Sequence, residues 1–438
     1  MRRRKRVANI SPINTEEQEE WQPKGPCRFQ QLPQALVIDI LSRLLVKTLF
    51  NCRCVCKSWL SIISDPHFSH MRLSKLPIGI LIKTRPEKRK SRVIDFTQIE
   101  ECAGSHFQLE KMRFSTKNNL PPLSEFELIN SCNGLLLLSG AGPIRDGPLY
   151  VCNPILGEFI TLPPTDGRRL CYSFFGLGYS VATKEYKVLQ TCSGNDRTDE
   201  NEAQIYTIGS GVWKSIGKTP QDSAQLAPFN AVLHGALHWL SFGGRTFEFI
   251  HTFNFGTEQF RTLPPPGYFE PFEKLFKECL KLGVLDGYLF LCVCGDDPRK
   301  FDMWVMKDYG VQESWTKTLV VEGLYLPTEL ANDVYEPLVF LRNGDILLCY
   351  NDWIVVCYNQ GTKSLKETRV ARTRSHFRAI GYNPCFFSLH DVAKGEEVKR
   401  VRDKKNSKKP FGVGSSGCAN SGIPQKSKKL NSGSGLPA

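Results

Sequence analysis

The sequence lacks the long apolar segments of secreted and membrane proteins. The basic residues at positions 2–6 are not followed by the apolar stretch of a signal peptide. No apolar run approaches the ~20 residues that a membrane-spanning helix needs. We therefore expect no membrane partner, a location in the cytoplasm or the nucleus, and reduced, mostly buried thiols at the 16 cysteines instead of a disulfide framework.

The sequence also lacks the signatures of common enzyme classes. It contains no GxSxG, no HExxH and no P-loop motif. One GxGxxG, Gly412–Gly417, follows a polar stretch, whereas a dinucleotide-binding fingerprint follows a strand and opens a helix. His234 and His238 flank a predicted strand pair around Gly235, and His238 is expected to be a core histidine. We therefore predict a non-catalytic protein without a cofactor.

A net positive charge is absent from the body of the chain, although the formal net charge is +13. Residues 2–6 are all basic, and residues 393–438 carry eleven Lys/Arg against three acidic residues. The two tails thus account for the whole excess, and residues 7–392 are neutral overall. We expect no nucleic-acid partner for the body, and the tails are either nuclear-import signals or solvated segments.

The chain does contain a short helical segment between its N-terminal tail and a long β region. Residues 1–28 and 393–438 have the composition of disordered tails. Pro33 suits the first turn of a helix, and Leu36, Ile40 and Leu44 follow at four-residue spacing, which predicts one apolar helix face. Two more short helices are expected before Pro66. Three helices of this size need a neighbour or a partner to cover their apolar faces.

From residue 76 onward, short apolar runs alternate with turns and share an aligned glycine. These glycines are Gly134, Gly235, Gly287 and Gly344; the last two gaps are 52 and 57 residues, and the first, of 101, leaves room for a further unit. A period near fifty residues with several strands in each unit indicates β-propeller blades. We predict about six blades, one of them built from residues 78–96 and 376–392, because strands from both ends close the ring without exposed sheet edges.

Two parts of the chain resemble known domains. The Leu-Pro opening, "ILSRL", "RCVCKSW" and "ISDPHF" of Leu32–Leu73 stand in the order of an F-box. "SCNGLLLL", "NPILGEFITLPP" and "GALHWL" are similar to the F-box-associated domain of plant proteins, a kelch-like or β-propeller domain. The resemblance implies an α+β multidomain protein: a short three-helix F-box at 29–73 followed by an all-β repeat domain at 76–392.

The resemblance implies the substrate-recognition subunit of a Skp–cullin–F-box ubiquitin ligase. The F-box would bind a Skp-family adaptor, and through it the cullin and RING subunits. The β domain would bind an unidentified protein substrate, promoting its ubiquitination and proteasomal degradation. By position in the motif, the adaptor-facing residues would be Leu32, Pro33, Leu36, Ile40, Leu41 and Leu44.

One departure from the F-box pattern supports an alternative. Leu45 stands where the family usually has proline after the first helix, and leucine loses the fixed φ that helps to stop a helix. Docking would then be weakened or re-angled. The alternative function is a non-ligase scaffold or nuclear protein-binding module with a weakened F-box.

The stretch "RCVCKSW", Arg53–Trp59, leaves three interpretations open. Cys52, Cys54 and Cys56 are separated by one residue instead of the two of a zinc knuckle, and only Cys52 and Cys56 would share a helix face. A redox centre would need an exposed thiol of low pKa. We favour packing, with the cysteines as small apolar fillers, no metal, and Val55 and Trp59 as core residues of the F-box.

Substrate contacts are expected in the loops of the β domain, because loops on a rigid scaffold vary freely. The candidate loops carry charges of both signs and span residues 140–148, 193–203, 241–246 and 294–302.

Overall fold

The structure is a computed structural model whose described residues belong to one compact unit, Met1–Arg402. The expectations for residues 1–28 and for the tail beyond residue 401 fall outside the described part and stay predictions. The described residues are 32–73, 79–84, 93–102, 106–123, 126–140, 147–165, 172–193, 202–219, 231–240, 250–267, 280–294, 301–321, 335–341, 343–372 and 376–401.

Four short helices open the described chain: α1 (Gln34–Ser42), α2 (Val46–Cys52), α3 (Lys57–Ser64) and α4 (Pro66–Leu73). As predicted, α3 ends before Pro66, because Asp65 is extended with φ −67° and ψ 126°. The prediction of three helices was wrong, since the same proline opens α4, where its fixed φ suits a first turn. None of the described helices is long and apolar enough to cross a membrane.

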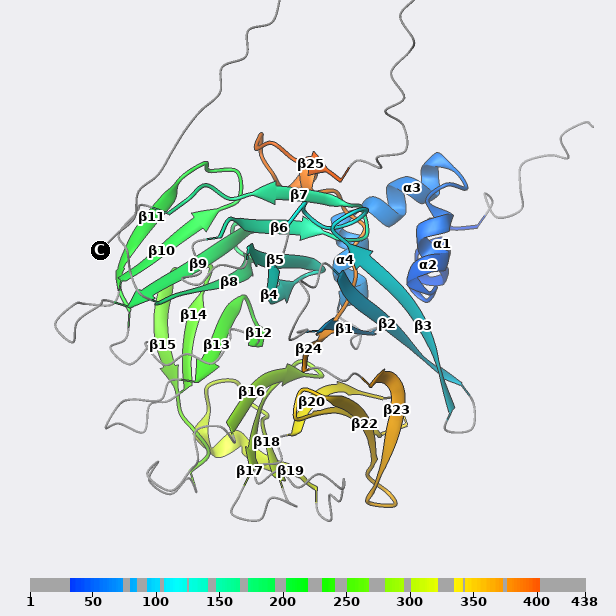
Figure 1. Ribbon diagram of the computed structural model, residues 1–438, viewed down its shortest axis with the longest axis vertical. Coiled ribbons are helices and arrows are strands. Elements are labelled where there is room, and N and C mark those ends of the chain that lie inside the picture. The colour runs from blue at the N-terminus through cyan, green and yellow to red at the C-terminus, as the bar shows by residue number, and fades with distance from the viewer. Residues whose placement is uncertain are drawn as a thin grey trace, which may run out of the picture. The chain divides into compact units, whose positions relative to one another are not determined.

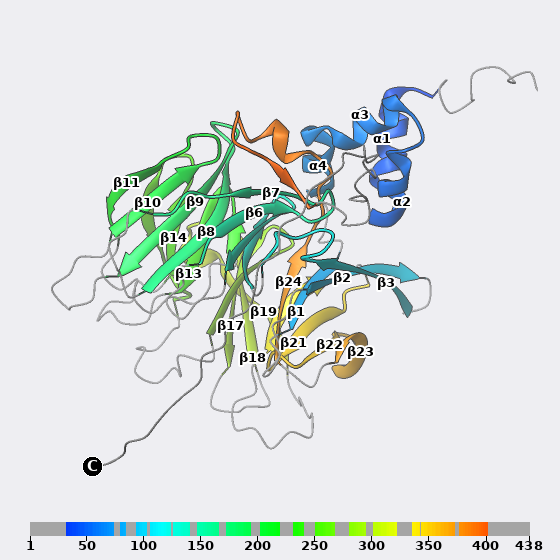
Figure 2. The same ribbon diagram turned by 45° about the horizontal axis from the view of Figure 1, so that its top comes forward.

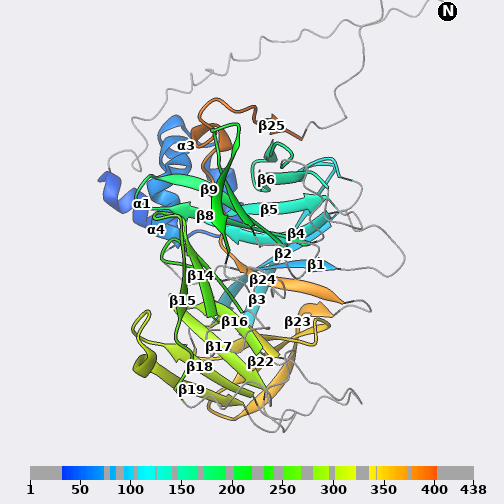
Figure 3. The same ribbon diagram turned by 90° about the vertical axis from the view of Figure 1, so that its left-hand side faces the viewer.

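Six antiparallel sheets follow and form a six-bladed β-propeller, as predicted. The blades follow one another around a ring in Figure 1 and can be traced from the side in Figure 3. Blade 1 contains β1 (Gly79–Thr84), β2 (Val93–Cys102), β3 (His106–Ser115) and β24 (Phe377–Tyr382). Blade 2 contains β4 (Phe126–Cys132), β5 (Leu135–Gly140), β6 (Leu149–Asn153), β7 (Glu158–Thr161) and β25 (Lys399–Arg400). Blade 3 contains β8 (Tyr172–Ser180), β9 (Glu185–Ser193), β10 (Glu202–Thr207) and β11 (Trp213–Lys218). Blade 4 contains β12 (Ala231–Leu233), β13 (Ala236–Leu240), β14 (Ile250–Asn254) and β15 (Gln259–Leu263); blade 5 contains β16 (Leu280–Leu285), β17 (Tyr288–Cys294), β18 (Phe301–Met306) and β19 (Trp315–Val321); blade 6 contains β20 (Tyr335–Phe340), β21 (Ile346–Tyr350), β22 (Ile354–Asn359) and β23 (Ser364–Arg372). Two 3₁₀ turns, η5 (Gln312–Ser314) and η6 (Leu389–Asp391), lie between strands.

Strands from both ends of the propeller close the ring, as predicted. β24 pairs antiparallel with β1, with Gly79 opposite Tyr382 and Thr84 opposite Phe377. Figure 2 shows the orange β24 beside the blue β1. This pairing joins residues about 300 positions apart in the sequence, and β24 covers the edge of β1 that would otherwise be unpaired.

The aligned glycines of the repeat occupy the turns between the first and second strands of their blades. Gly134, Gly235, Gly287 and Gly344 have φ of 84°, 72°, 77° and 86°. Glycine adopts this left-handed region without the strain that a Cβ causes, which explains why the repeat is visible in the sequence. Blade 3 fills the double gap between the first two of these glycines, as predicted.

The F-box helices and the first two blades share one hydrophobic core. Leu41 and Leu49 of the helices belong to the same buried cluster as Phe96 of blade 1. The backbone N–H of Val46 donates to Oε1 of Gln98 on β2 over 2.9 Å. Because α2 has no side-chain cap of its own, blade 1 supplies a partner for the start of this helix.

Residues 383–401, here called the strap, follow β24 and bind across blade 2. Glu158 of β7 is fully buried, and its Oε2 accepts from Ser388 Oγ and from the Leu389 N–H, each over 2.8 Å. Its Oε1 accepts from Arg400, whose Nη2 lies 2.6 Å away. The prediction of a disordered tail from residue 393 was therefore wrong for residues 393–401. This polar segment is ordered because Arg400 binds the buried carboxylate of Glu158 on a distant strand.

Candidate partner-binding surfaces

Exposed apolar side chains are concentrated on the F-box. Leu36 and Ile40, one turn apart on α1, are 52% and 38% exposed, whereas Val37 and Leu41 on the other side of the helix lie in the core. An apolar helix face left in solvent is typical of a protein interaction site. Among the other predicted adaptor-facing residues, Pro33 is also exposed, and Leu32 and Leu44 are half-buried against the core. The prediction was wrong for Leu41, which is only 1% exposed and belongs to the core.

The prediction of Val55 as a core residue was wrong. Val55 is 63% exposed, because the helix ends at Cys52 and a turn precedes α3, so that Val55 and Trp59 no longer share a helix face. Trp59 is half-buried and packs against the core. Phe50 and Leu60, each 40% exposed, are further exposed apolar residues of the F-box that the sequence analysis missed. We define the F-box face as Leu36, Ile40, Phe50, Val55 and Leu60.

The three cysteines near Arg53 have three different environments. Cys52 is buried, and burial raises the pKa of its thiol. Cys54 is exposed, and Cys56 is the N-cap residue of α3, where its Sγ accepts from the Trp59 N–H over 3.4 Å. In the part of the chain that the structure describes, no three His, Cys, Asp or Glu side chains converge in a way that could hold a metal ion.

The cap at Cys56 gives a prediction that separates capping from metal binding. Cys56→Ser should leave stability unchanged or raise it slightly, because serine oxygen is a preferred N-cap acceptor, whereas Cys56→Ala should cost ~1 kcal/mol of unfolding free energy. Urea unfolding with and without a chelator measures both effects. A loss of stability in Cys56→Ser that zinc restores would contradict the capping role.

The candidate substrate loops all join corresponding strands of their blades. They connect β5 to β6, β9 to β10, β13 to β14 and β17 to β18. With the innermost strand of each blade counted as the first, each loop joins the second strand to the third. Since strands alternate in direction within each blade, these ends all lie at one end of the propeller, here called face A. Most residues of these loops lie outside the described part, so their role stays a prediction.

Described residues of face A include an exposed tryptophan and a cluster of charges. Trp353, in the link between β21 and β22, is 39% exposed, and its Nε1 donates to His376 Nε2 over 3.1 Å. Lys281, Glu336 and Arg378 are each the second residue of an inner strand. Lys281 Nζ lies 3.9 Å from Glu336 Oε2, and burial raises the pKa of Glu336 while this lysine lowers it. Tryptophan and arginine are enriched in protein-binding surfaces.

The two spaced histidines have different environments. His234 lies in the turn before Gly235, with φ of 50°. His238 is 1% exposed on β13, and its two ring nitrogens lie 3.3 Å from the Ala231 carbonyl and 2.7 Å from the Tyr309 hydroxyl. Burial lowers the pKa of His238 to about 4, so the ring is neutral near pH 7 and serves as a buried hydrogen-bonding group, as expected.

Residues 90–388 match the F-box associated beta propeller domain, and residues 29–74 match the F-box-like domain. The chain belongs to the F-box-associated β-propeller family. This F-box protein is 28% identical over 385 residues to F-box protein At3g07870 of Arabidopsis thaliana, covering 77% of this chain and 87% of the relative. It is also 28% identical over 415 residues to the Arabidopsis F-box protein CPR1, covering 85% and 94% of the two chains. Both resemblances in the sequence are thereby confirmed.

Among solved structures, TolB from Acinetobacter baumannii is similar with a TM-score of 0.37 and 12% identity, covering 72% of this chain and 69% of that one. These values are too low to inform the function. The F-box protein thus combines an F-box with a β-propeller domain, which is the organisation of an F-box substrate receptor.

Proposed function

We propose that this F-box protein is the substrate-recognition subunit of a Skp–cullin–F-box ubiquitin ligase. The observation that supports it most is the exposed apolar F-box face, above all Leu36 and Ile40 on α1. A Skp-family adaptor would cover this face and bring the cullin and RING subunits. The propeller would bind the protein substrate at face A, the ligase chemistry would take place on the other subunits, and the complex would act in the cytoplasm or nucleus.

The test is capture of purified Skp adaptor by the full-length protein. The isolated F-box is not suitable, because its core is shared with blades 1 and 2. Leu36→Asp combined with Ile40→Asp should weaken capture at least ~30-fold, since each change places a charge in a desolvated contact. Val181→Asp, at a residue that is 70% exposed in a turn of blade 3, is the matched control and should change nothing. Undiminished binding of the double variant would disprove the proposal.

The alternative of a weakened F-box loses support at Leu45. This residue precedes α2 with φ −58° and ψ 150°, which is the φ that proline would fix. The helix boundary is therefore in place without proline. Leu45→Pro belongs in the same capture experiment: the ligase proposal expects similar adaptor binding, whereas the scaffold alternative expects the variant to bind the adaptor far more tightly than the wild type.

A further inference from the structure

We propose that a pocket between the strap and blades 2 and 3 binds an arginine side chain of a partner protein. The pocket has a volume of about 240 Å³, which is below the ~300–1,000 Å³ of sites for drug-sized ligands and suits a single side chain. Its walls come from three distant parts of the sequence: Thr161 at the end of β7 with Pro163 after it, Tyr206 and Gly211 of blade 3, and Glu396, Glu397 and Lys399 of the strap.

One carboxylate oxygen of Glu396 accepts three hydrogen bonds, whereas the other accepts none from the described residues. Its Oε1 accepts from the Tyr206 hydroxyl, from the Gly209 N–H over 2.8 Å and from the Gly211 N–H over 3.3 Å. Its Oε2 is buried and has no hydrogen-bond partner among the described residues. A buried carboxylate oxygen without a donor is costly, so the pocket favours a ligand that brings N–H groups to it.

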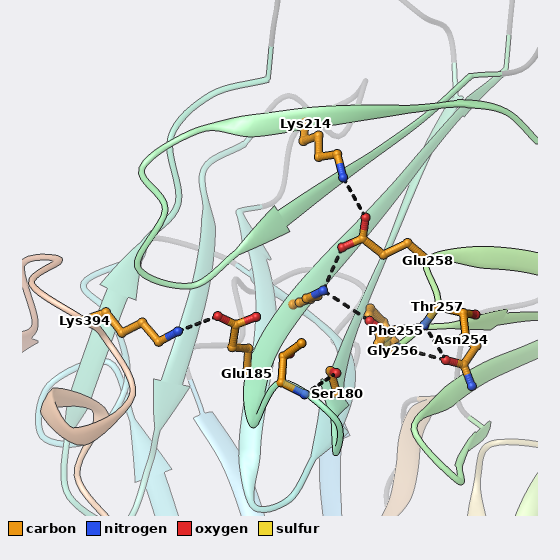
Figure 4. A network of polar contacts seen from close by, with 11 residues as sticks. Ser180, Glu185, Lys214, Asn254, Phe255, Gly256, Thr257, Glu258 and Lys394 are labelled. Carbon is orange, nitrogen blue, oxygen red and sulfur yellow. Dashed lines mark hydrogen bonds and ion pairs between the residues drawn. The ribbon is translucent and has the colours of Figure 1, made fainter.

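The charges around the pocket leave Glu396 uncompensated. Lys394 pairs with Glu185 of blade 3, a contact seen in Figure 4. Lys399 pairs with Glu397 over 3.2 Å. Both cations near Glu396 therefore have a carboxylate of their own, and one negative charge remains at the pocket. A cationic ligand would neutralise it.

The walls favour guanidinium over a compact ammonium group. Pro163 and the buried Tyr206 ring present apolar surface, and Tyr206 is fixed by Trp213, whose ring centroid is 5.3 Å away. Trp213 in turn donates from Nε1 to the Pro163 carbonyl over 3.0 Å. Guanidinium is planar and weakly hydrated, and it can lie along such walls while donating to a carboxylate. The site is separate from the F-box face and from face A, and it does not depend on the ligase proposal.

The test uses the full-length protein without adaptor and a defined probe, N-acetyl-arginine methylamide, titrated by saturation-transfer NMR. We expect a dissociation constant on the order of 1 mM, as for a ligand of this size with one charged contact. Glu396→Gln should weaken binding at least ~10-fold, because it removes the charge from the hydrogen bond. Glu313→Gln changes an exposed carboxylate of η5 in blade 5, outside the pocket, and should change affinity less than ~2-fold because only a screened surface charge is lost.

A second variant tests whether Glu396→Gln weakens binding only by loosening the strap. Thr161→Trp fills the pocket from an exposed position on β7 and makes no change in the strap. It should abolish probe binding while leaving the melting temperature unchanged. The proposal is overturned if Thr161→Trp still binds the probe, if Glu313→Gln weakens binding as much as Glu396→Gln, or if the lysine or norleucine analogue of the probe binds as tightly as arginine.

Discussion

Replacing Gly134 with alanine should destabilise the protein by roughly 4 kcal/mol, of which ~1–2 comes from backbone strain at positive φ and ~1–3 from overpacking. A Cβ at Gly134 would lie 2.6 Å from both the backbone nitrogen and the Cβ of Cys385 in the strap. The strap cannot easily withdraw, since Asn153 Nδ2 donates to the Phe387 carbonyl over 3.0 Å and the Tyr382 hydroxyl donates to the Gly134 carbonyl over 2.8 Å.

Gly287→Ala provides the matched control for this prediction. Gly287 has φ of 77° and follows Asp286, just as Gly134 follows Asn133. A Cβ added at Gly287 would have no other atom within 4 Å. The control should therefore show only the backbone term, ~1–2 kcal/mol. Urea unfolding followed by tryptophan fluorescence compares the two. Equal losses in the two variants would mean that the contact with the strap contributes nothing.

Glu258→Gln should cost about 3 kcal/mol, because it leaves a buried ammonium group without a counter-charge. Glu258, in the turn between β14 and β15 of blade 4, accepts from Lys187 Nζ over 2.7 Å. It also accepts from Lys214 Nζ over 2.9 Å (Figure 4). Lys187, on β9 of blade 3, is 5% exposed at its side chain and also donates to the Phe255 carbonyl over 3.2 Å. The group thus joins two blades.

Two further variants isolate the buried pair. Lys214→Met removes the second lysine that pairs with Glu258. The side chain of Lys214 is 69% exposed, so this change should lower the unfolding free energy by less than ~1 kcal/mol. Lys187→Met combined with Glu258→Gln should recover most of the loss, since a buried ion pair replaced by apolar or neutral groups is often close to neutral in stability. If the double variant is as unstable as Glu258→Gln alone, the unpaired ammonium is not the cause.

The same contact predicts a pH dependence. Burial alone would raise the pKa of Glu258, but Lys187 and Lys214 bring it below its ordinary value of 4.5. A carboxyl whose pKa is lower in the folded state stabilises the protein above that ordinary value, and the stabilisation is lost as the pH falls through the folded-state pKa. The difference in unfolding free energy between the wild type and Glu258→Gln should therefore be complete at pH 7 and shrink in acid.

Local patterns in the sequence were sufficient for the repeat and for helix α1, whereas α4 was not predicted. Gly134, Gly235, Gly287 and Gly344 mark turns because only glycine takes a positive φ without strain, and that requirement is local. The apolar spacing of Leu36, Ile40 and Leu44 likewise predicted α1. Ring closure could be predicted because end strands of a repeat domain that stay unpaired are unfavourable, whatever their separation in the sequence.

Only the tertiary structure decided which residues face solvent and where the folded unit ends. Leu41 and Leu36 are both apolar residues of α1, but Leu41 lies in the core that the F-box shares with blades 1 and 2, whereas Leu36 is exposed. The strap has the composition of a disordered tail, and it is ordered because Glu158 lies buried beneath Arg400 and the start of η6. Periodicity and composition report on neighbours along the chain, whereas burial and charge compensation depend on residues brought together from more than 200 positions away.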